Sequence, residues 1–271
     1  MDAPNNALNG KRIVLTRSSE QAGILLQQLK GRGAQVIALP FVEFRPPGDF
    51  APLDSALSRL VEFDWIVFTS QNAVRFFCTR MRELSPATVN PAAFPRVAAI
   101  GDATAGAAAA EGLRVEFVAS GVRSGREFVA EFSRNARARK ILLPQSDQAG
   151  DDFAAGLRDG GAIVTPVVAY RTCMPESLDS EGLTRLRREG ADVFLFASPS
   201  AFHNFARAVG RSELNRFARD SIFAAIGPTT AQAIRKAGVP VGIEAAKPSS
   251  DEIVKAMIAH FSKPKQAKAR P

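Results

Sequence analysis

The chain contains Asp64-Trp-Ile-Val-Phe-Thr-Ser-Gln-Asn-Ala73, an apolar run that leads directly into polar residues and a helix-like pattern. The same arrangement returns as Asp192-Val-Phe-Leu-Phe-Ala-Ser-Pro-Ser-Ala201. Apolar runs without polar alternation are typical of strands buried on both faces, which occur in parallel sheets covered by helices. The two stretches therefore predict one strand–helix unit that is present twice.

The repetition extends over most of the chain. Three further pairs of segments recur in the same order: Arg12-Ile-Val-Leu-Thr-Arg-Ser-Ser-Glu-Gln-Ala-Gly23 with Lys140-Ile-Leu-Leu-Pro-Gln-Ser-Asp-Gln-Ala-Gly150, Ala99-Ile-Gly-Asp-Ala-Thr-Ala105 with Ala225-Ile-Gly-Pro-Thr-Thr-Ala231, and Ser124-Gly-Arg-Glu127 with Ser249-Ser-Asp-Glu252. A common order and nearly constant spacing indicate a repeat architecture. We therefore predict an internally duplicated protein.

Each copy alternates short apolar runs with helix-length segments. The ten runs are Ile13–Thr16, Gln35–Leu39, Trp65–Thr69, Val97–Ile100, Val115–Val118, Ile141–Leu143, Ile163–Val168, Val193–Ala197, Ile222–Ile226 and Val239–Ile243. This alternation predicts an α/β fold with parallel sheets and right-handed crossovers. Ten strands fit two five-stranded, doubly wound sheets better than one continuous sheet.

The composition is that of an ordinary globular protein. The 271 residues, of which 46% are hydrophobic and 23% charged, predict one or two domains. Of the net charge of +8, four positive charges lie in residues 263–271, which contain no acid. Because half of the excess lies in this short segment, and because no zinc-finger spacing or RNA-binding aromatic signature occurs, we predict no nucleic-acid partner.

Membrane, metal and cofactor functions are not predicted either. No run approaches the roughly 18 charge-free apolar residues of a membrane span, and Met1–Gly10 lacks the apolar core of a secretory signal. Cys78 and Cys173 lie far apart, so we expect a reducing, cytoplasmic location without disulfides. Two isolated histidines and the lack of a GxGxxG fingerprint predict neither a metal nor a cofactor.

Small polar side chains follow several predicted strands, where helices begin: Ser70, Thr104, Ser198, Thr229 and Thr230. Open parallel sheets bind ligands outside the carboxyl ends of their strands, where helix N-termini present free amide donors to anions. Two similar domains facing each other would line a cleft with such sites, which predicts a large polyanionic ligand. Helix capping alone also explains these residues, above all Ser198 followed by proline. The pattern leaves both interpretations open.

Six short segments, in order from Val14 to Ala231, form a recognisable set within a match that runs from about residue 11 to 262. They are Val14-Leu-Thr-Arg17, Phe68-Thr-Ser-Gln-Asn-Ala-Val74, Ala99-Ile-Gly101 with Thr104, Ala169-Tyr-Arg171, Ser198-Pro-Ser-Ala201 and Ala225-Ile-Gly-Pro-Thr-Thr-Ala231. Each segment alone is loose, whereas the set together with the duplication is fairly specific. This set resembles the uroporphyrinogen-III synthase family of tetrapyrrole biosynthesis.

The resemblance implies two flavodoxin-like domains with parallel sheets, joined by a two-segment hinge. In that family the chain starts in one domain, completes the other and then returns. Carried over to this chain, residues 1–41 with 173–271 form one domain, residues 44–170 form the other, and segments 41–46 and 167–173 form the hinge. The residue pattern by itself equally allows two sequential domains, 11–136 and 139–262.

The resemblance also implies a reaction, that of a cofactor-free lyase which converts hydroxymethylbilane, a linear tetrapyrrole with eight carboxylates, to uroporphyrinogen III. A hydroxyl leaves as water, ring D is inverted through a spirocyclic intermediate, and the macrocycle closes. Without an enzyme the same substrate closes to the non-inverted isomer, so holding one folded pose is the main catalytic task. We expect a cytoplasmic monomer whose partner is this small molecule.

Tyr170, the only tyrosine of the chain, lies at the family's tyrosine position. Its phenol is the candidate acid for the departing hydroxyl, and packing at the hinge is the alternative interpretation. Arg17 is a candidate carboxylate clamp, and Gln145 stands at the comparable turn of the second copy. Further candidates for substrate binding are Ser70, Asn72, Gly101, Thr104, Ser198, Ser200, Gly227, Thr229 and Thr230. A non-catalytic two-domain sensor of a polyanionic small molecule is the alternative function.

Overall fold

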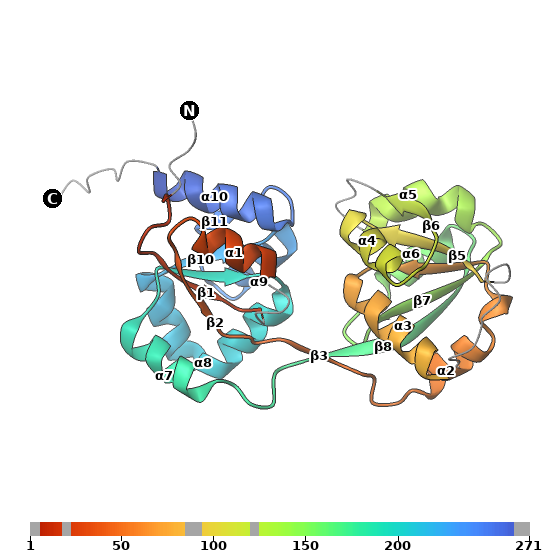
Figure 1. Ribbon diagram of the computed structural model, residues 1–271, viewed down its shortest axis with the longest axis horizontal. Coiled ribbons are helices and arrows are strands. Elements are labelled where there is room, and N and C mark those ends of the chain that lie inside the picture. The colour runs from red at the N-terminus through yellow and green to blue at the C-terminus, as the bar shows by residue number, and fades with distance from the viewer. Residues whose placement is uncertain (1–5, 18–22, 85–93, 120–124, 263–271) are drawn as a thin grey trace. The chain divides into compact units, whose positions relative to one another are not determined.

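The structure, a computed structural model, describes residues 6–17, 23–84, 94–119 and 125–262 (Figure 1). The chain divides into two compact units. Unit 1 comprises Met1–Glu43 with Cys173–Pro271, and unit 2 comprises Phe44–Thr172. The chain therefore crosses from one unit to the other twice. That these two crossings act as a hinge stays a prediction.

Unit 1 contains a five-stranded sheet in the order β11-β10-β9-β1-β2. Its strands are β1 (Arg12–Leu15), β2 (Gln35–Ala38), β9 (Val193–Phe196), β10 (Ile222–Ala225) and β11 (Ile243–Glu244). Its helices are α1 (Gly23–Lys30), α7 (Ser180–Glu189), α8 (Pro199–Asp220), α9 (Pro228–Lys236) and α10 (Ser250–Ser262). All four neighbouring pairs of strands are parallel.

Both faces of this sheet are covered, as its unbroken apolar runs require. On one face Ile13 packs in a core cluster with Leu25 of α1 and Met257 of α10, and all three are buried. On the other face the ring of Phe194 lies 5.0 Å from that of Phe205 and 4.9 Å from that of Phe217, both on α8. Within β9, Val193 and Leu195 belong to the cluster of Ile13 whereas Phe194 packs on α8, so alternate side chains of this strand enter two separate cores.

Unit 2 contains a six-stranded sheet in the order β3-β8-β7-β4-β5-β6. Its strands are β3 (Glu43–Arg45), β4 (Trp65–Phe68), β5 (Arg96–Ile100), β6 (Val115–Ala119), β7 (Lys140–Ser146) and β8 (Ile163–Cys173). Its helices are α2 (Ala51–Ser58), the short 3-10 helix η1 (Leu60–Glu62), α3 (Gln71–Leu84), α4 (Asp102–Ala110), α5 (Gly125–Ala136) and α6 (Asp152–Asp159). The four pairs β8–β7, β7–β4, β4–β5 and β5–β6 are parallel.

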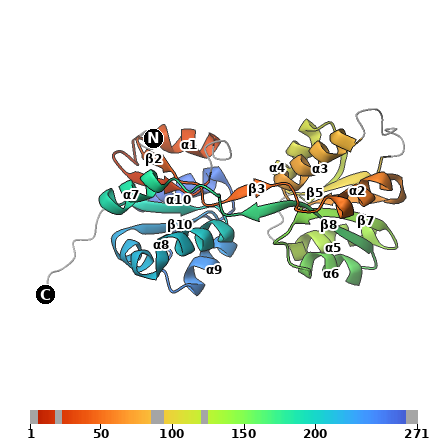
Figure 2. The same cartoon turned by 90° about the horizontal axis from the view of Figure 1, so that it is seen from below.

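Helices cover both faces of this second sheet as well. Figure 2 shows α3 and α4 on one face and α5 and α6 on the other. Phe68 of β4 packs with Phe77 of α3 in one core cluster, and Val67 packs with Phe132 of α5 in the other. The predicted α/β fold with parallel sheets is therefore confirmed, whereas its flavodoxin-like character stays a prediction. Within the described residues, no helix is both long and apolar enough to cross a membrane.

The prediction of two five-stranded sheets is wrong for unit 2. Strand β3 adds a sixth strand beside β8, and β8 extends to Cys173 instead of ending near Val168. Ala169 and Tyr170, which follow Val168, are buried, and the exposed Arg171 comes after them, so the prediction ended this strand too early. For residues 41–46, extended structure follows from the family resemblance and not from the residue pattern.

The predicted strand Val239–Ile243 is also largely wrong, because only Ile243–Glu244 is paired. The N–H of Val239 donates to the Ile234 carbonyl oxygen at the end of α9, 3.3 Å away. Pro240 has no N–H to donate to a neighbouring strand. The helix end therefore uses the first part of this apolar run, and Val239 is buried without belonging to the sheet.

Candidate functional site

Equivalent serines end equivalent strands in the two units. Ser70 follows β4 and Ser198 follows β9. In each turn the serine Oγ accepts a hydrogen bond from the backbone N–H three residues later, that of Ala73 or Ala201, at 3.1 Å. The predicted helix cap at Ser198, with Pro199 in the first helical position, is confirmed. Both serines therefore fix a helix N-terminus at the carboxyl end of a sheet.

Tyr170 lies on β8 with only 7% of its surface exposed. Its hydroxyl is 3.2 Å from the Ser70 Oγ, so the two side chains share a hydrogen bond. The phenol ring stacks on Phe76 with centroids 5.6 Å apart and planes inclined by 14°. Phe44 meets the same ring edge-on, also at 5.6 Å. These three contacts hold the phenol in one orientation.

Burial raises the pKa of the Tyr170 phenol above its ordinary value. Hydrogen bonds with the hydroxyls of Ser70 and Ser146 lower the pKa because they stabilise the phenolate, and the negative charge of Asp147 raises it. The net direction is upward, so the phenol keeps its proton throughout the neutral pH range. A protonated, oriented hydroxyl is the state that a proton donor requires.

The other predicted residues of unit 2 lie around the first turns of α3 and α4. Asn72 is half-buried at the second position of α3. Gly101 precedes α4 with φ of 78° and ψ of 155°, a backbone region that is essentially restricted to glycine. Thr104 is 5% exposed. Within the described residues, Ser70 is the one among these predicted residues that hydrogen-bonds to Tyr170.

The predicted residues of unit 1 lie around the first turns of α8 and α9. Ser200 is half-buried at the second position of α8. Gly227 precedes α9, and Pro228 occupies the first helical position. Thr229 is exposed, whereas Thr230 is 4% exposed. The structure thus brings one of the two adjacent threonines to the surface and buries the other.

Arg17 follows β1 on the same edge of the unit 1 sheet. Its side chain is half-buried, and this burial lowers its pKa from the ordinary value for arginine. Among the described residues, no ion pair or hydrogen bond of the guanidinium occurs. A partly desolvated guanidinium can bind a ligand carboxylate.

Three residues beside Tyr170 were missed by the sequence analysis. Ser146 lies directly opposite Tyr170 in the pairing of β7 with β8. The Asp147 N–H donates to the Tyr170 carbonyl oxygen at 3.0 Å, and the Asp147 carboxylate accepts from the N–H of Thr172 at 2.9 Å. Ser146 and Asp147 belong to the repeated segment Lys140–Gly150, and their position after a strand was a usable signal.

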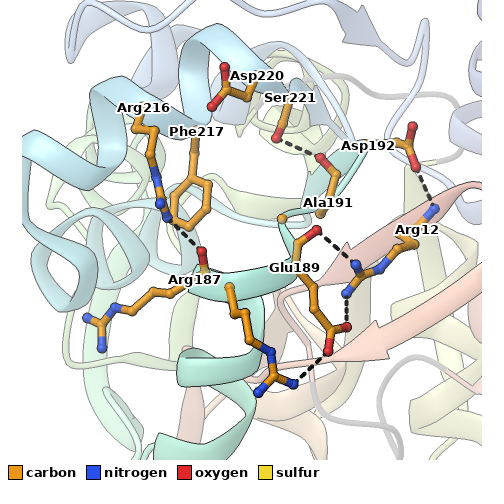
Figure 3. A pocket seen from close by; sticks show the side chains of 11 residues that line it. Arg12, Arg187, Glu189, Ala191, Asp192, Arg216, Phe217, Asp220 and Ser221 are labelled. Carbon is orange, nitrogen blue, oxygen red and sulfur yellow. Dashed lines mark hydrogen bonds and ion pairs between the residues drawn. The ribbon is translucent and has the colours of Figure 1, made fainter.

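A pocket of about 410 Å³ lies at the opposite, amino-terminal edge of the unit 1 sheet. It is lined by Arg12, Arg187, Arg188, Glu189, Gly190, Ala191, Asp192, Arg216, Phe217, Asp220 and Ser221. Figure 3 shows Arg12 reaching the end of α7, where it donates to the carbonyl oxygen of Glu189 at 2.9 Å and to its carboxylate at 2.8 Å.

Each lining arginine of this pocket is paired with a glutamate. Arg12 and Arg188 pair with Glu189, and the other two lining arginines pair with Glu213. Hydrogen bonds from Arg188 and Arg185 lower the pKa of Glu189 to about 2. These ion pairs tie α7 to β1 and to α8.

The carboxyl edge of unit 1 carries amide donors, small hydroxyls and Arg17, a set that can bind carboxylates. The carboxyl edge of unit 2 carries amide donors, small hydroxyls and the protonated phenol of Tyr170, which can give a proton to a leaving hydroxyl. Within the described residues, no group of three or more histidine, cysteine, aspartate or glutamate side chains is placed to hold a metal ion.

Comparisons with known proteins agree on one family. A family model described as uroporphyrinogen-III synthase HemD matches residues 9–255. The uroporphyrinogen-III synthase of Synechococcus elongatus is 29% identical over 260 residues, which cover 92% of this chain and 95% of the relative. The chloroplastic uroporphyrinogen-III synthase of Oryza sativa is 27% identical over 266 residues, covering 96% of this chain and 83% of the relative.

Solved structures show the same fold. A mutant uroporphyrinogen III synthase of Thermus thermophilus superposes with a TM-score of 0.62 and 15% identity, covering 94% of this chain and all of the other. The uroporphyrinogen-III synthetase of Helicobacter pylori gives the same TM-score with 18% identity, covering 92% and 99%. Because the family model spans most of the sequence, the chain belongs to the uroporphyrinogen-III synthase family, the lyases that cyclise hydroxymethylbilane in haem and tetrapyrrole biosynthesis.

Proposed function

We propose that this chain converts hydroxymethylbilane to uroporphyrinogen III, with inversion of ring D and loss of water, and that Tyr170 is its catalytic acid. The single observation that supports this best is the buried phenol, held against Ser70 at 3.2 Å on the carboxyl edge of unit 2. Family membership supports the reaction class, and the oriented phenol of Tyr170 supports a proton donor for the departing hydroxyl.

The first step is the departure of the substrate hydroxyl. The carbon–oxygen bond breaks with its electron pair on oxygen, the phenol of Tyr170 gives its proton to that oxygen, and water leaves. The hydroxyl of Ser70 stabilises the phenolate that remains, because hydrogen bonds to an ionised form favour it. The cationic carbon left behind is attacked by the substituted α-carbon of ring D, which gives the spirocyclic intermediate. The bond from this α-carbon to its original bridging carbon then breaks, and the bridging carbon bonds to the free α-carbon of ring D instead. The proton lost from that position when the pyrrole regains aromaticity restores the phenol.

The remaining candidate residues bind the acidic side chains of the substrate. The N-termini of α3, α4, α8 and α9 present amide donors, which carboxylates accept readily. Ser198, Ser200 and Thr229 add hydroxyls at two of these termini, and Arg17 adds a positive charge. Asn72, Gly101 and Gly227 shape the turns that carry these donors. Thr104 and Thr230 add hydroxyls that are almost fully buried near the first turns of α4 and α9. Binding at several points selects one folded pose, which decides between the two isomers.

The reaction transfers no electrons, because substrate and product differ only by water. The reaction therefore needs no redox cofactor. We propose that the protein acts without a cofactor or a metal, as a cytoplasmic monomer whose partner is the tetrapyrrole alone. Cys78 is buried and Cys173 half-buried, and both are free thiols. Free thiols are compatible with a reducing compartment.

An isomer-resolved cyclisation assay tests this function. Purified protein receives freshly generated hydroxymethylbilane without added metal or cofactor, and the oxidised products are separated as isomers I and III. We expect isomer III in excess over an enzyme-free blank. Formation of isomer I alone by folded protein would contradict the proposal. Tetrapyrrole binding without turnover would instead support the sensor.

A further inference from the structure

An irregularity in β8 turns Tyr170 toward the core. The pairing of β7 with β8 proceeds in step up to Gln145 opposite Val168, and then Ser146 lies opposite Tyr170, so that Ala169 is passed over. Ala169 and Tyr170 both belong to the same core cluster as Val167. In a regular strand, neighbouring side chains point to opposite faces. A bulge of this kind changes the direction of a side chain.

The turn after β7 holds β8 on both sides of residue 171, directly after the bulge. The N–H of Asp147 donates to the carbonyl oxygen of Tyr170 at 3.0 Å. The N–H of Thr172 donates to the Asp147 Oδ1 at 2.9 Å, and the Gln148 side-chain amide donates to the Thr172 carbonyl oxygen at 2.7 Å. The backbone before and after residue 171 is thereby tied to two consecutive residues of the turn.

Hydroxyl groups complete the same cluster. The Ser146 hydroxyl donates to the Asp147 Oδ1 at 3.1 Å, and its oxygen lies 2.9 Å from the Thr172 Oγ1. The N–H of Gln148 also donates to the Ser146 Oγ, at 3.2 Å. The Asp147 Oδ1 therefore accepts from both the serine hydroxyl and the β8 backbone, which makes this carboxylate the centre of the cluster.

We propose that Asp147 is a positioning residue for the cyclisation, because its carboxylate clamps the bulge of β8 and thereby sets the Tyr170 phenol against Ser70. The proposal rests on the proposed function, in which Tyr170 is the acid. Asp147 itself touches no reacting atom in this scheme. Its effect on the reaction passes through Tyr170.

Two substitutions separate the geometry from the charge. Asp147→Ala removes the acceptor for Thr172 N–H and Ser146, so we expect kcat to fall about 10- to 100-fold, the cost of a misplaced catalytic group, with KM little changed. Asp147→Asn keeps an oxygen that can accept from Thr172 and is expected to retain most of kcat. Asp151→Ala is the matched control, since this exposed aspartate pairs with Arg158 on α6.

A double-substitution test shows whether Asp147 acts through Tyr170. In a Tyr170→Phe background, Asp147→Ala is expected to cause no further fall in kcat. An undiminished further fall would overturn the proposal, as would full activity of Asp147→Ala in the native background. Failure of the proposed function is distinguishable, because then the unaltered protein forms no isomer III or Tyr170→Phe keeps full activity.

Spectroscopic titration provides a readout that needs no turnover. Because the chain has a single tyrosine, tyrosinate absorbance reports Tyr170 alone. Asp147→Asn removes a negative charge and is expected to lower the pKa of the phenol, whereas Ser146→Ala removes a stabilising hydrogen bond and is expected to raise it. Charged side chains on the elements around Tyr170 include Asp147 on the turn after β7, Arg75 and Arg171. The guanidinium of Arg75 lies 4.7 Å from the Phe76 ring centroid, and the Nε of Arg171 donates to the Pro46 carbonyl oxygen.

A lowered pKa in Asp147→Asn shows that the carboxylate charge reaches the phenol, and retention of most of kcat in the same variant separates the clamp from this charge, even where Asp147→Ala fails to fold. A titration that neither substitution moves, in folded protein, would show that the turn after β7 does not act on the phenol and would overturn the proposal.

Discussion

The carboxyl edges of the two sheets carry the same turns and different chemistry. Ser70 and Ser198 cap their helices through the same contact at the same distance, and Thr104 and Thr230 are both buried near the next helix N-terminus. The edge of unit 2 alone carries a phenol, because the chain has one tyrosine. Duplication therefore provided two equivalent sets of turns, and the candidate acid belongs to one of them.

The repeat also supplies the counterpart of this tyrosine. Pro40-Phe-Val-Glu-Phe-Arg45 corresponds to Pro166-Val-Val-Ala-Tyr-Arg171, which places Phe44 where the second copy has Tyr170. In the structure these two rings pack edge-on, with centroids 5.6 Å apart. One copy thus contributes an apolar wall and the other a hydroxyl, and a pair of reciprocal substitutions can test this difference.

The largest effect is expected for Tyr170→Phe. Loss of a general acid costs about 100-fold or more in kcat, while the loss of one buried hydrogen bond costs about 1 kcal/mol of unfolding free energy. Cyclisation is slowed rather than abolished, since substrate binding is unchanged. The isomer-resolved assay measures kcat, and denaturant unfolding followed by Trp65 fluorescence measures the stability of unit 2.

The pH profile sharpens this test. The phenol donates only while protonated, so kcat of the unaltered protein is expected to fall as the pH rises through the raised pKa of Tyr170. That alkaline fall is expected to disappear in Tyr170→Phe. Phe44→Tyr is the control and should leave kcat and its pH profile in place. Unchanged kcat in Tyr170→Phe would contradict the assignment of Tyr170 as the acid and would mean that another group donates the proton.

Much of the fold could be predicted from sequence because its signals are local. Buried parallel strands appear as unbroken apolar runs, and the repeat confirms each run against its copy. The signal failed where backbone hydrogen bonds, and not apolar side chains, determine the structure. Strand β3 pairs at a sheet edge and has few apolar residues. Val239 donates its N–H to the last turn of α9 instead of pairing with a strand. Hydrogen-bond partners distant in sequence are invisible to a local pattern.

The site was predictable in position and only partly in geometry. Strand ends indicated Ser70 and Ser198, since ligand sites of parallel sheets lie there. The contact of Ser70 with Tyr170 joins residues 100 positions apart, and the family resemblance alone pointed to that tyrosine. The bulge beside Ser146 has no signature in the residues, because it depends on how two strands are paired. Similarly, the burial of Thr230 beside the exposed Thr229 follows from the packing of α9.

A smaller effect, on stability, is expected from alanine at the paired glycines. Gly101→Ala meets no atom within 4 Å but must adopt φ of 78°, so we expect a loss of about 1–3 kcal/mol from backbone strain. Gly227 has extended φ of 178°, and its added Cβ would lie 3.2 Å from the Pro248 Cβ. Overpacking of this kind costs about 1–3 kcal/mol, less where the neighbour can move.

A double-mutant cycle separates the two causes. Pro248→Gly removes the atom that the new Cβ at position 227 meets, so its combination with Gly227→Ala is expected to be less destabilised than the sum of the single changes. For the combination of Pro248→Gly with Gly101→Ala, the losses of unfolding free energy are expected to add, because residues 248 and 101 lie in different units. Unit 1 lacks a tryptophan, so its unfolding is followed by circular dichroism, which reports both units, in comparison with Trp65 fluorescence, which reports unit 2. Additivity in both combinations would contradict the steric explanation.

The smallest expected difference lies between Ser70→Ala and Ser198→Ala, and it tests the comparison most directly. Each change removes a helix cap of the same geometry, so each is expected to cost about 1 kcal/mol of unfolding free energy. Only Ser70→Ala also removes a hydrogen bond to the phenol. Since that bond lowers the pKa of Tyr170, its loss is expected to raise the pKa in the tyrosinate titration, with about a tenfold fall in kcat. Ser198→Ala should leave the titration in place and act on KM. Equal effects of both changes on kcat and on the titration would mean that the phenol does not distinguish the two edges.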